Sequence, residues 1–489
     1  MKQARWLIPQ TDAHQAESLV SALGVSWPAA RVLLARGYQN PETARRFLKP
    51  SLEDLHDPFL LLGLPAALER LQRAIARQEK ILLYGDYDVD GATSVVIVKK
   101  AIQLAGGQAD FHVPHRIRQG YGMRPEIVEQ AAAQGVTLLI SLDTGIRAAG
   151  VVRHASELGI DVIITDHHLP DAQLPPALAV LNPKQPGCPY PEKNLCGAGV
   201  AFKLAQALVG SLGWPAARVA RVAESFLKPA AIATVADVVP LTGENRVIAK
   251  HGLAGLASVR SPGLRALLEV AGIPAGTAPT ARQVAFQIAP RLNAAGRMAT
   301  AEAAVELLLT TEPARASELA RQLHEHNAER QQVEAGIRAA CEAVAVSGDE
   351  RGLVYYGEDW HRGVLGIVAG RLAERHSLPV FVLGGESGGL AQGSGRSIPA
   401  FQLLEALEAM PDLFVRFGGH SHAAGVTLAA ARVDEFRRRF NAYAAERLKP
   451  EDLVREYRID AVVELGEIDE ASVAGIQALA PFGHGNPAP

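Results

Sequence analysis

Three apolar runs of β-forming residues, each ending at an aspartate, constrain the fold of this chain most strongly. They are Ile81-Leu-Leu-Tyr-Gly-Asp86, Thr137-Leu-Leu-Ile-Ser-Leu-Asp143 and Asp161-Val-Ile-Ile-Thr-Asp166, and stretches with helical patterns separate them. Continuous apolar strands that alternate with helices indicate a parallel sheet covered on both faces. Ligands of open α/β sheets bind at the carboxyl ends of the strands. The three aspartates are therefore predicted to converge on one site of an α/β fold.

The first strand end carries three acidic residues, in the segment Gly85-Asp86-Tyr-Asp88-Val-Asp90-Gly91. Alternate side chains of an extended segment point to the same side. Carboxylates held so close together repel one another unless cations neutralise them. A calcium-binding EF-hand loop is excluded, because its twelfth position, counted from Asp86, is Ile97 instead of glutamate.

The third strand ends in Asp166-His167-His168. We expect the two histidines to point in different directions, so that one binds metal while the other faces substrate. Mixed imidazole and carboxylate ligands suit Mn²⁺, and carboxylates alone would also suit Mg²⁺. Asp237 lies on a helical pattern among small apolar residues, where a carboxylate needs a partner or a cation.

Composition limits the remaining choices. A chain of 489 residues that is 48% hydrophobic is too long for a single hydrophobic core, so two to four domains are expected. No apolar run has the length of a membrane span or a signal peptide, which predicts a cytoplasmic protein. The three cysteines, Cys188, Cys196 and Cys341, suit a reducing compartment without a disulfide framework.

The net charge of −3 does not by itself indicate a nucleic-acid partner. Local arginine clusters can still bind phosphate, and we interpret the run Arg437-Arg438-Arg439 as a solvated helix face. The clusters that we consider for phosphate binding are Arg116 with Arg118, and Arg291 with Arg297.

Taken in chain order, four motifs resemble those of the DHH phosphoesterase superfamily. They are Asp-x-Asp-x-Asp-Gly at 86–91, Asp-x-Gly at 143–145, Asp-His-His at 166–168 and Ala-Asp-Val at 236–238. The first is similar to the RecJ branch, since family II inorganic pyrophosphatases place a histidine ahead of the aspartates. Further RecJ-like stretches are Val113-Pro-His-Arg116, Gly120-Tyr-Gly122, Gly197-Ala-Gly-Val-Ala-Phe-Lys203, Pro290-Arg-Leu-Asn-Ala-Ala-Gly-Arg297, Trp360-His-Arg-Gly-Val-Leu-Gly-Ile367 and Gly418-Gly-His-Ser-His-Ala-Ala-Gly425.

This resemblance implies a centre of two divalent ions, Mn²⁺ or Mg²⁺. The matching ligands are Asp88, Asp90, Asp143, His167 and Asp237, with Asp143 as the bridge. Asp86 is either a further ligand or a base outside the ligand shell. Asp166 is expected to orient its neighbours, and His168 to meet the scissile phosphate.

The resemblance also implies a substrate site in a second, DHH-associated domain. There the backbone at Gly419 would approach a nucleotide and His420 would touch phosphate, while His422 has either a functional or an incidental role. Ser394 and Arg396 resemble a pocket for a terminal phosphate, with Arg116 opposite. Arg291 and Arg297 are the alternative phosphate contacts.

Five regions are expected along the chain. They are an N-terminal helical region (1–55), a DHH catalytic domain (56–270), connector helices (271–346) that include a long exposed helix from 313, a smaller α/β DHH-associated substrate-binding domain (347–455), and the start of an OB-type β domain (456–489). Fewer than the five strands of an OB barrel fit into the last region, so we expect the natural sequence to continue.

The function implied is 5′ to 3′ exonucleolytic hydrolysis of single-stranded DNA in recombination and repair. The expected partners are single-stranded DNA, a single-strand-binding protein and a helicase, for a monomer without membrane contact. Two alternatives stay open. One is a DHH phosphodiesterase of short oligonucleotides or cyclic dinucleotides, and the other is a catalytically silent RecJ-like replication scaffold.

Overall fold

The computed structural model describes residues 5–115, 120, 122–298, 300–454 and 456–489. The chain folds into two compact units. The larger unit consists of Pro9–Asn327 with Asp460–Pro489, and the smaller of Met1–Ile8 with Ala328–Ile459. Helix α15 (Pro313–Glu342) begins in the larger unit and ends in the smaller one. The five expected regions are thus grouped into two bodies.

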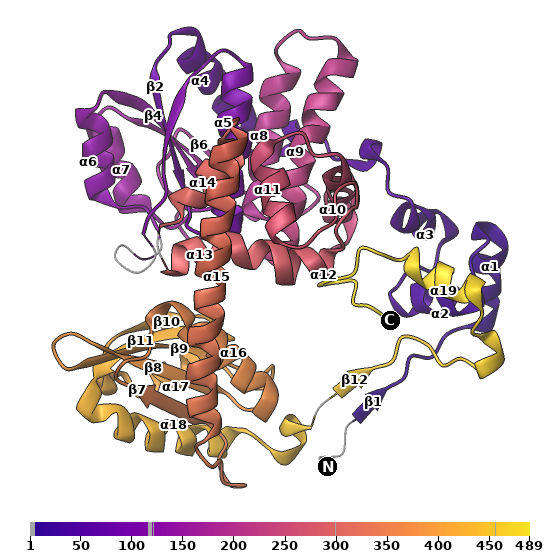
Figure 1. Ribbon diagram of the computed structural model, residues 1–489, viewed down its shortest axis with the longest axis vertical. Helices are drawn as coiled ribbons and strands as arrows, with labels where there is room; N and C mark the ends of the chain where they lie inside the picture. Colours follow the sequence, from indigo (N-terminus) through magenta and orange to yellow (C-terminus); the bar gives the residue numbers. More distant parts are fainter. Residues whose placement is uncertain (1–4, 116–119, 121, 299, 455) are drawn as a thin grey trace. The chain divides into compact units, whose positions relative to one another are not determined.

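The larger unit is built on a five-stranded sheet in the order β3-β2-β4-β5-β6, and every neighbouring pair is parallel (Figure 1). Its strands are β2 (Lys80–Gly85), β3 (Ala109–His112), β4 (Val136–Leu142), β5 (Asp161–Thr165) and β6 (Ala179–Leu181). The predicted parallel sheet is confirmed, and Asp86, Asp143 and Asp166 each directly follow a strand.

Helices cover both faces of this sheet because its central strands present apolar side chains to both sides. Ile81 and Leu83 of β2 point into one core, and Leu82 and Tyr84 point into the other. The helices on the first side are α4 (Leu64–Ala76), α5 (Val89–Leu104), α8 (Gly197–Gly210) and α9 (Ala216–Ala236). Those on the second side are α6 (Pro125–Ala133) and α7 (Ala149–Glu157).

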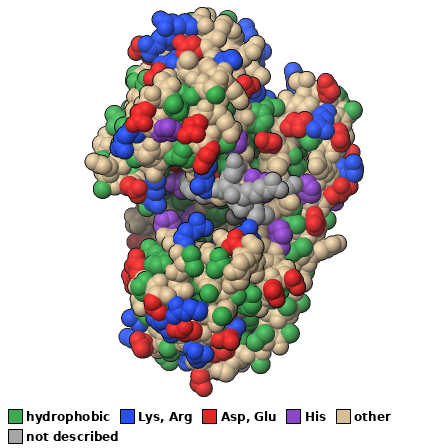
Figure 2. Space-filling model, turned by 90° about the vertical axis from the view of Figure 1, so that its left-hand side faces the viewer, with side chains coloured by type: hydrophobic (Ala, Val, Ile, Leu, Met, Phe, Trp, Pro, Cys, Tyr) green, Lys and Arg blue, Asp and Glu red, His purple; other side chains and the backbone are tan. Residues whose placement is uncertain are grey.

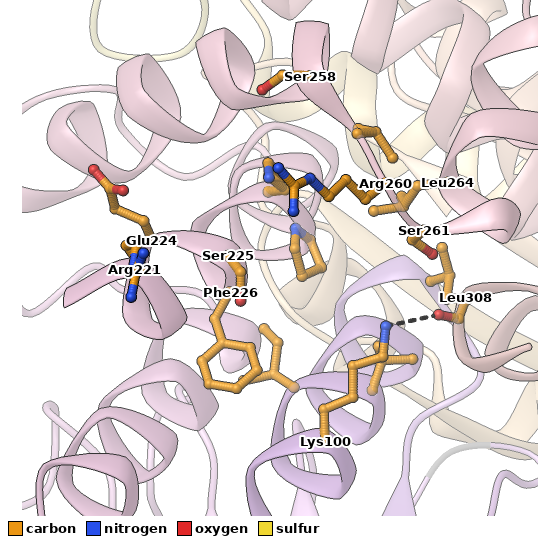
Figure 3. A pocket seen from close by; sticks show the side chains of 15 residues that line it. Lys100, Arg221, Glu224, Ser225, Phe226, Ser258, Arg260, Ser261, Leu264 and Leu308 are labelled. Carbon is orange, nitrogen blue, oxygen red and sulfur yellow. Dashed lines mark hydrogen bonds between the residues drawn. The ribbon is translucent and has the colours of Figure 1, made fainter. Parts of the chain in front are cut away.

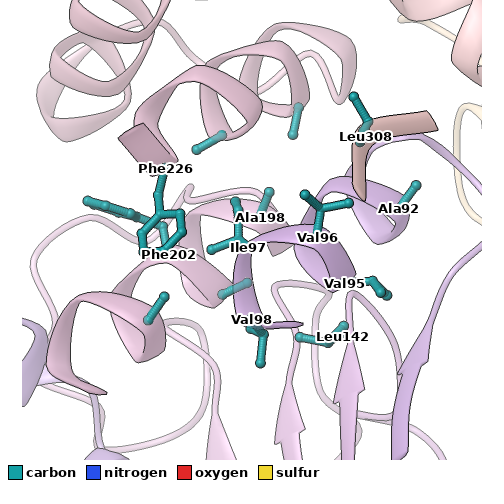
Figure 4. Packing of buried hydrophobic residues seen from close by; sticks show 14 of the residues in the cluster. Ala92, Val95, Val96, Ile97, Val98, Leu142, Ala198, Phe202, Phe226 and Leu308 are labelled. Atoms are coloured by element: carbon teal, nitrogen blue, oxygen red, sulfur yellow. The ribbon is translucent and has the colours of Figure 1, made fainter. Parts of the chain in front are cut away.

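Helix α5 is the centre of the larger core. Val95, Val96, Ile97 and Val98 occupy four successive positions, and each is at most 2% exposed, so the helix is buried on all sides. In Figure 4, Phe226 and Leu308 lie on one side of α5 and Leu142 of β4 lies on the other. The end of α5 that carries the aspartates is therefore held by the whole core.

The expected connector region belongs largely to this same core. Its helices bury Leu292 and Val305 beside the residues of α5 and α9. Helix α15 begins as a packed helix, with Ala316, Leu319 and Leu323 at most 1% exposed. The expected helix is long, and in these turns it buries one apolar stripe while Pro313, Glu318 and Arg321 stay exposed. The helices of this region are α12 (Ala281–Gln283), α13 (Ala289–Met298) and α14 (Glu302–Leu309), and they follow α10 (Gly243–Gly255) and α11 (Pro262–Val270) of the expected catalytic domain.

The smaller unit contains a second five-stranded sheet, in the order β10-β11-β9-β8-β7. Only β7 and β8 are parallel, so this sheet is mixed. Buried Phe381, Phe436 and Phe440 pack edge-to-face beneath it. Its elements are β7 (Leu353–Gly357), α16 (Arg362–His376), β8 (Val380–Glu386), β9 (Leu390–Arg396), α17 (Leu403–Glu408), β10 (Phe414–Gly419), β11 (Ala423–Ala429) and α18 (Val433–Arg447). The expected second α/β domain is confirmed.

The surface carries both signs of charge. On the face shown in Figure 2, Lys and Arg side chains are interspersed with Asp and Glu, in keeping with the net charge of −3. Among the described helices, none alone has the length and apolar character needed to cross a membrane, whereas α1 (Ala13–Leu23) and α2 (Trp27–Ala35), joined at a bend of 117°, meet both criteria as a pair.

The last residues of the chain bind the N-terminal helices to the larger core. Arg246 of α10 is 1% exposed and donates to the carbonyls of Leu479 at 2.8 Å and Ala480 at 3.0 Å, and also to that of Phe47 in α3 (Pro41–Leu48). Asn486 is fully buried and donates to the carbonyls of Leu479 and Pro481 at 2.9 and 2.7 Å. We call residues 479–486 the C-terminal clasp.

The expected start of an OB-type domain falls on this part of the chain. The described residues between 456 and 489 form one short strand, β12 (Glu456–Arg458), one 3₁₀ turn (Leu465–Glu467) and one α-helix, α19 (Glu470–Gln477). β12 pairs in parallel with β1 (Arg5–Leu7), and α19 packs on α2. The boundary of an OB-type domain at residue 456 stays a prediction.

Asn486→Ala should lower the free energy of unfolding of the larger unit by about 2–3 kcal/mol, because it removes two buried hydrogen bonds, to the carbonyls of Leu479 and Pro481. Urea unfolding followed by tryptophan fluorescence measures this change. His484→Ala is the matched control, since this exposed residue contributes only its backbone carbonyl, to the amide of Leu241 at 2.8 Å. Equal free energies of unfolding for the two variants would contradict the proposed stabilising role of the C-terminal clasp.

Candidate metal centre

The acidic segment after β2 is held at the N-terminus of α5. Asp88 is the N-cap residue, and its Oδ1 accepts hydrogen bonds from the amides of Asp90 at 2.9 Å and Gly91 at 3.1 Å. A side chain at Gly91 is excluded, because its Cβ would lie 2.4 Å from the carbonyl oxygen of Asp86. The turn from strand to helix therefore brings three carboxylates together at the positive end of a helix dipole.

Asp90 is held by a second helix N-terminus. Its carboxylate accepts from the amides of Gly197 at 2.6 Å and Ala198 at 2.7 Å, the first residues of α8. The Gly197-x-Gly-x-x-x-Lys203 stretch thus binds a carboxylate of the chain itself. These two bonds link α5 and α8 across the site, since the residues lie more than 100 positions apart in the sequence.

Asp143 directly follows β4 and has a φ of 63°, in the left-handed region. Few residues other than glycine adopt this conformation, although Asp and Asn are enriched there. Gly197 packs against its side chain, and a Cβ at Gly197 would lie 2.6 Å from both Cβ and Oδ1 of Asp143. Gly197 therefore serves twice, by binding Asp90 and by leaving room for Asp143.

The two histidines point differently, as expected from their adjacent positions. His167 is 7% exposed, and its Nε2 lies 3.2 Å from Asp143 Oδ1 and 3.7 Å from a carboxylate oxygen of Asp90 and of Asp237. The side chain of His168 is 43% exposed, and its Nδ1 lies 2.8 Å from Asp166 Oδ1. Asp237 is the C-cap residue of α9, so the predicted helical position is correct.

Asp166 is buried completely and holds its neighbours in place. Its Oδ1 accepts from the amides of His167 and His168, and its Oδ2 accepts from the amide of Ile146 at 3.0 Å. Burial alone would raise the pKa of Asp166, but the bonds from His168 and the backbone outweigh it and lower the pKa. Asp166 is thus fixed as an anion that orients the imidazole of His168.

The electrostatics of the cluster favour a cation. Burial and the neighbouring carboxylates raise the pKa of Asp90 to about 6, that of Asp237 to about 9, and that of Asp143 well above its ordinary value. Burial and His168 lower the pKa of His167 to about 3, which keeps its ring neutral and able to bind metal. Within the described part of the chain, Asp143 Oδ1 and His167 Nε2 are buried without a hydrogen bond.

Three groups of side chains could each hold an ion, with their ligand atoms within 4.8 Å of one another. They are Asp86 with Asp88 and Asp143, Asp90 with His167 and Asp237, and Asp143 with His167 and His168. The seven catalytic residues predicted from the sequence, six near strand ends and Asp237 at the end of α9, therefore lie together. Asp143 belongs to two of the groups, which is the arrangement that a bridging carboxylate needs. The crowded, unsatisfied carboxylate and imidazole donors fit divalent cations.

Two supporting residues were missed by the sequence analysis. Asn293 of α13 accepts from the amide of Val89 at 3.1 Å through its Oδ1. Gly296 packs against the carbonyl of Tyr87, since a Cβ there would lie 2.8 Å from that oxygen. Both belong to the motif at 290–297, in which only Arg291 and Arg297 had been considered. Arg291 itself donates to His324 Nδ1 at 3.2 Å.

The predicted substrate residues of the smaller unit also lie together. Arg396 at the end of β9 donates to Ser394 Oγ at 2.7 Å, and it is paired in the sheet with Ala423 of β11. The tight β10–β11 connection requires Gly419, whose φ is 146° and whose Cβ would lie 2.4 Å from the carbonyl oxygen of Ala423. His420 is exposed in this connection. Arg116 lies outside the described residues.

At the strand ends of this parallel sheet, aspartates and histidines lie close enough together to bind metal ions. This combination of fold and site is typical of metal-dependent phosphoesterases of the DHH class. Family comparisons agree with this class. Residues 80–234 match the DHH family, N-terminal domain, and residues 349–446 match the DHHA1 domain.

Curated relatives are more specific. The chain is 42% identical to the single-stranded-DNA-specific exonuclease RecJ of Bacillus subtilis over 99% of its own length and 61% of the relative's. It is 40% identical to the RecJ of Dickeya dadantii over 90% of its length and 80% of the relative's. A crystal structure of Thermus thermophilus RecJ with Mn²⁺ matches at a TM-score of 0.86 and 34% identity, over 99% of this chain and 69% of that one. The chain belongs to the RecJ family of single-stranded-DNA-specific exonucleases.

Gly197→Ala should weaken Mn²⁺ binding by roughly 10- to 100-fold, as expected for loss of a residue that positions metal ligands. The added methyl group would displace Asp143 and disturb the amide that binds Asp90. Gly210→Ala, at the other end of α8, has open space around its Cβ and is the matched control. Calorimetric titration with Mn²⁺ should leave the control unchanged. Equal affinities of both variants would exclude this role of Gly197.

Proposed function

We propose that this chain hydrolyses phosphodiester bonds of single-stranded DNA from a free end, in the 5′ to 3′ direction, at a centre of two divalent ions. The observation that carries the proposal is the sharing of Asp143 between two groups of potential ligands. Membership of the RecJ family supports the substrate and the polarity. The chain spans 61% of the length of the Bacillus subtilis relative. The activity of the whole protein is therefore proposed from membership of the family.

The ligands of the two ions are proposed to be Asp86, Asp88, Asp90, Asp143, His167 and Asp237. Two divalent cations lower the pKa of a water and neutralise the oxygen that leaves. Asp86 is proposed as a direct ligand because it groups with Asp88 and Asp143 at ligand distance. Crystal structures of Thermus thermophilus RecJ contain Mn²⁺ in one case and Mg²⁺ in another, which supports either ion here.

His168 is proposed to contact the scissile phosphate. Asp166 accepts from its Nδ1, which fixes the orientation of a ring whose side chain is 43% exposed. A donor fixed in this way can bind a phosphate oxygen without reorganising. Because the nucleophile is water, the site needs no serine or cysteine nucleophile.

In the smaller unit, Ser394, Arg396, Gly419 and His420 are proposed to hold the terminal phosphate and the adjoining nucleotide. A guanidinium prepositioned by Ser394 suits the bidentate geometry of phosphate. Arg116, Arg291 and Arg297 remain candidate phosphate contacts. Roles in recombination and repair, and partnership with a single-strand-binding protein and a helicase, follow from the family alone.

The two alternatives have less support. A silent replication scaffold does not need the buried ligand groups. Burial and the neighbouring carboxylates raise the pKa of Asp237 to about 9, and a bound cation would relieve this repulsion. A phosphodiesterase of short oligonucleotides shares the same chemistry, and its preferred substrate length distinguishes it.

Asp143→Asn should reduce hydrolysis of end-labelled single-stranded DNA in Mn²⁺ by about three orders of magnitude or more. Removal of one electrostatic contact to a transition state already costs about 10²–10³ in rate, and this carboxylate would serve two ions. Asparagine tolerates the left-handed conformation and preserves the fold. Asp110→Asn, an exposed aspartate of β3, is the control and should keep full activity. Turnover of Asp143→Asn at the level of Asp110→Asn would contradict the two-ion centre.

Arg396→Ala should reduce the preference for a 5′-phosphorylated strand over a 5′-hydroxyl strand by about tenfold, because a charge-assisted contact is lost. The ratio of kcat/KM for the two strands measures this. Arg416→Ala, which changes an exposed arginine on β10 of the same sheet, should keep the ratio of the unmodified protein. An unchanged ratio in Arg396→Ala would place the end-phosphate contact at another arginine.

A further inference from the structure

A second cavity lies in the larger unit, apart from the metal centre. It has a volume of about 560 Å³ and lies among α5, α9, the end of α14 and the segment 258–264 (Figure 3). This volume falls within the range of small-molecule sites. Lys100 follows Asp90 by ten positions on α5, which places the cavity about 15 Å along that helix from the ligand.

The walls of this cavity are strongly cationic. Lys100, Arg221, Lys228 and Arg260 line it, and Glu224 is the only acidic residue among its lining residues. Within the part of the chain that the structure describes, none of the four cations forms an ion pair with a carboxylate. Their charge is therefore available to a ligand. In Figure 3, Arg221 and Glu224 project from α9 at one side, and Arg260 comes from the opposite segment.

Lys100 gives the cavity a partly buried ammonium group. Its Nζ donates to the carbonyl of Leu308 at 3.1 Å, as the dashed line in Figure 3 shows. Burial lowers the pKa of this ammonium group, and no carboxylate offsets the effect. A partly buried charge that meets only a carbonyl is poorly compensated. An anion in the cavity would supply the missing charge.

The floor of the cavity is apolar, with Val96, Ile97, Phe226 and Leu264 buried there. Ser225, Ser258 and Ser261 also line the cavity and add hydroxyl groups to its walls. A site with apolar walls and a few placed polar groups is typical of organic ligands. Inorganic phosphate alone would leave the floor unused.

We infer that this cavity binds a small phosphorylated organic molecule of the size of a nucleotide. Its phosphates would contact Arg221, Lys228 and Arg260, and its organic part would lie on the apolar floor above Lys100. A continuous DNA strand fits less well, because strand-binding grooves present exposed aromatic rings for stacking. The one aromatic residue of this cavity, Phe226, is only 3% exposed.

The test is calorimetric titration of the intact protein with adenosine 5′-diphosphate in excess EDTA, so that no metal ion holds phosphate at the carboxylate cluster. We expect binding by the unmodified protein and at least a tenfold weaker affinity for the Arg221→Ala/Arg260→Ala double variant. Both arginines are exposed, so the fold should be unaffected. Ser258→Trp keeps the cations but fills the cavity, and it should also abolish binding.

Two controls locate the site. Arg153→Ala removes an exposed cation on α7 and should bind like the unmodified protein. Arg396→Ala removes the proposed end-phosphate contact and measures how much of the nucleotide binding belongs to that site. No binding by the unmodified protein, or binding lost only in Arg396→Ala, would overturn the inference. If pyrophosphate binds as tightly as adenosine 5′-diphosphate, the apolar floor does not contact the organic part of the ligand, and that part of the inference is wrong. Displacement of the nucleotide by an equal concentration of a 5′-hydroxyl oligothymidine would identify the cavity as part of a DNA path instead.

Discussion

The fold of the larger unit must compensate the mutual repulsion of the carboxylates at its candidate metal centre. Asp86, Asp88, Asp90, Asp143 and Asp237 approach one another in a mostly buried site, where anions are costly. The fold offsets part of this cost with backbone amides. The N-terminus of α5 binds Asp88, and that of α8 binds Asp90. The amides leave ligand atoms of Asp143 and His167 without hydrogen bonds, and the proposed divalent cations would complete the compensation.

The sequence predicted the parts of this centre that depend on local pattern. Apolar strands that end in Asp86, Asp143 and Asp166 predicted the parallel sheet and the edge where its ligands meet, and the structure agrees. The contacts that hold the ligands are not local. Ala198 lies 108 positions from Asp90, and Asn293 lies 204 positions from Val89, so no spacing rule joins them. The left-handed φ of Asp143 likewise depends on the packing of Gly197.

Elsewhere, tertiary packing overrode composition. The polar stretch from Pro313 suggested an exposed helix, yet its few apolar side chains, such as Leu319 and Leu323, are sufficient to bury one stripe.

The sequence of the C-terminal clasp does not reveal that it binds the N-terminal helices to the larger core. The hydrogen bonds of the clasp are accepted by backbone carbonyls, which every residue has. Arg246 recognises them from 233 positions away. The sequence analysis also did not detect the cationic cavity, since its four cations come from α5, from α9 and from the segment before α11. Its walls include α5 and α9, the two helices that are capped by Asp88 and Asp237.

The central claim is that Asp143 joins two ions in one centre. Equilibrium dialysis with Mn²⁺, combined with electron paramagnetic resonance, tests it most directly. We expect two ions per chain and the spectrum of an exchange-coupled pair, since the ions of two-metal sites lie about 3.5–4 Å apart. In Asp143→Asn the coupling should disappear, even where one ion is retained. A single ion per chain at saturation, or two ions with uncoupled spectra in the unmodified protein, would contradict the account.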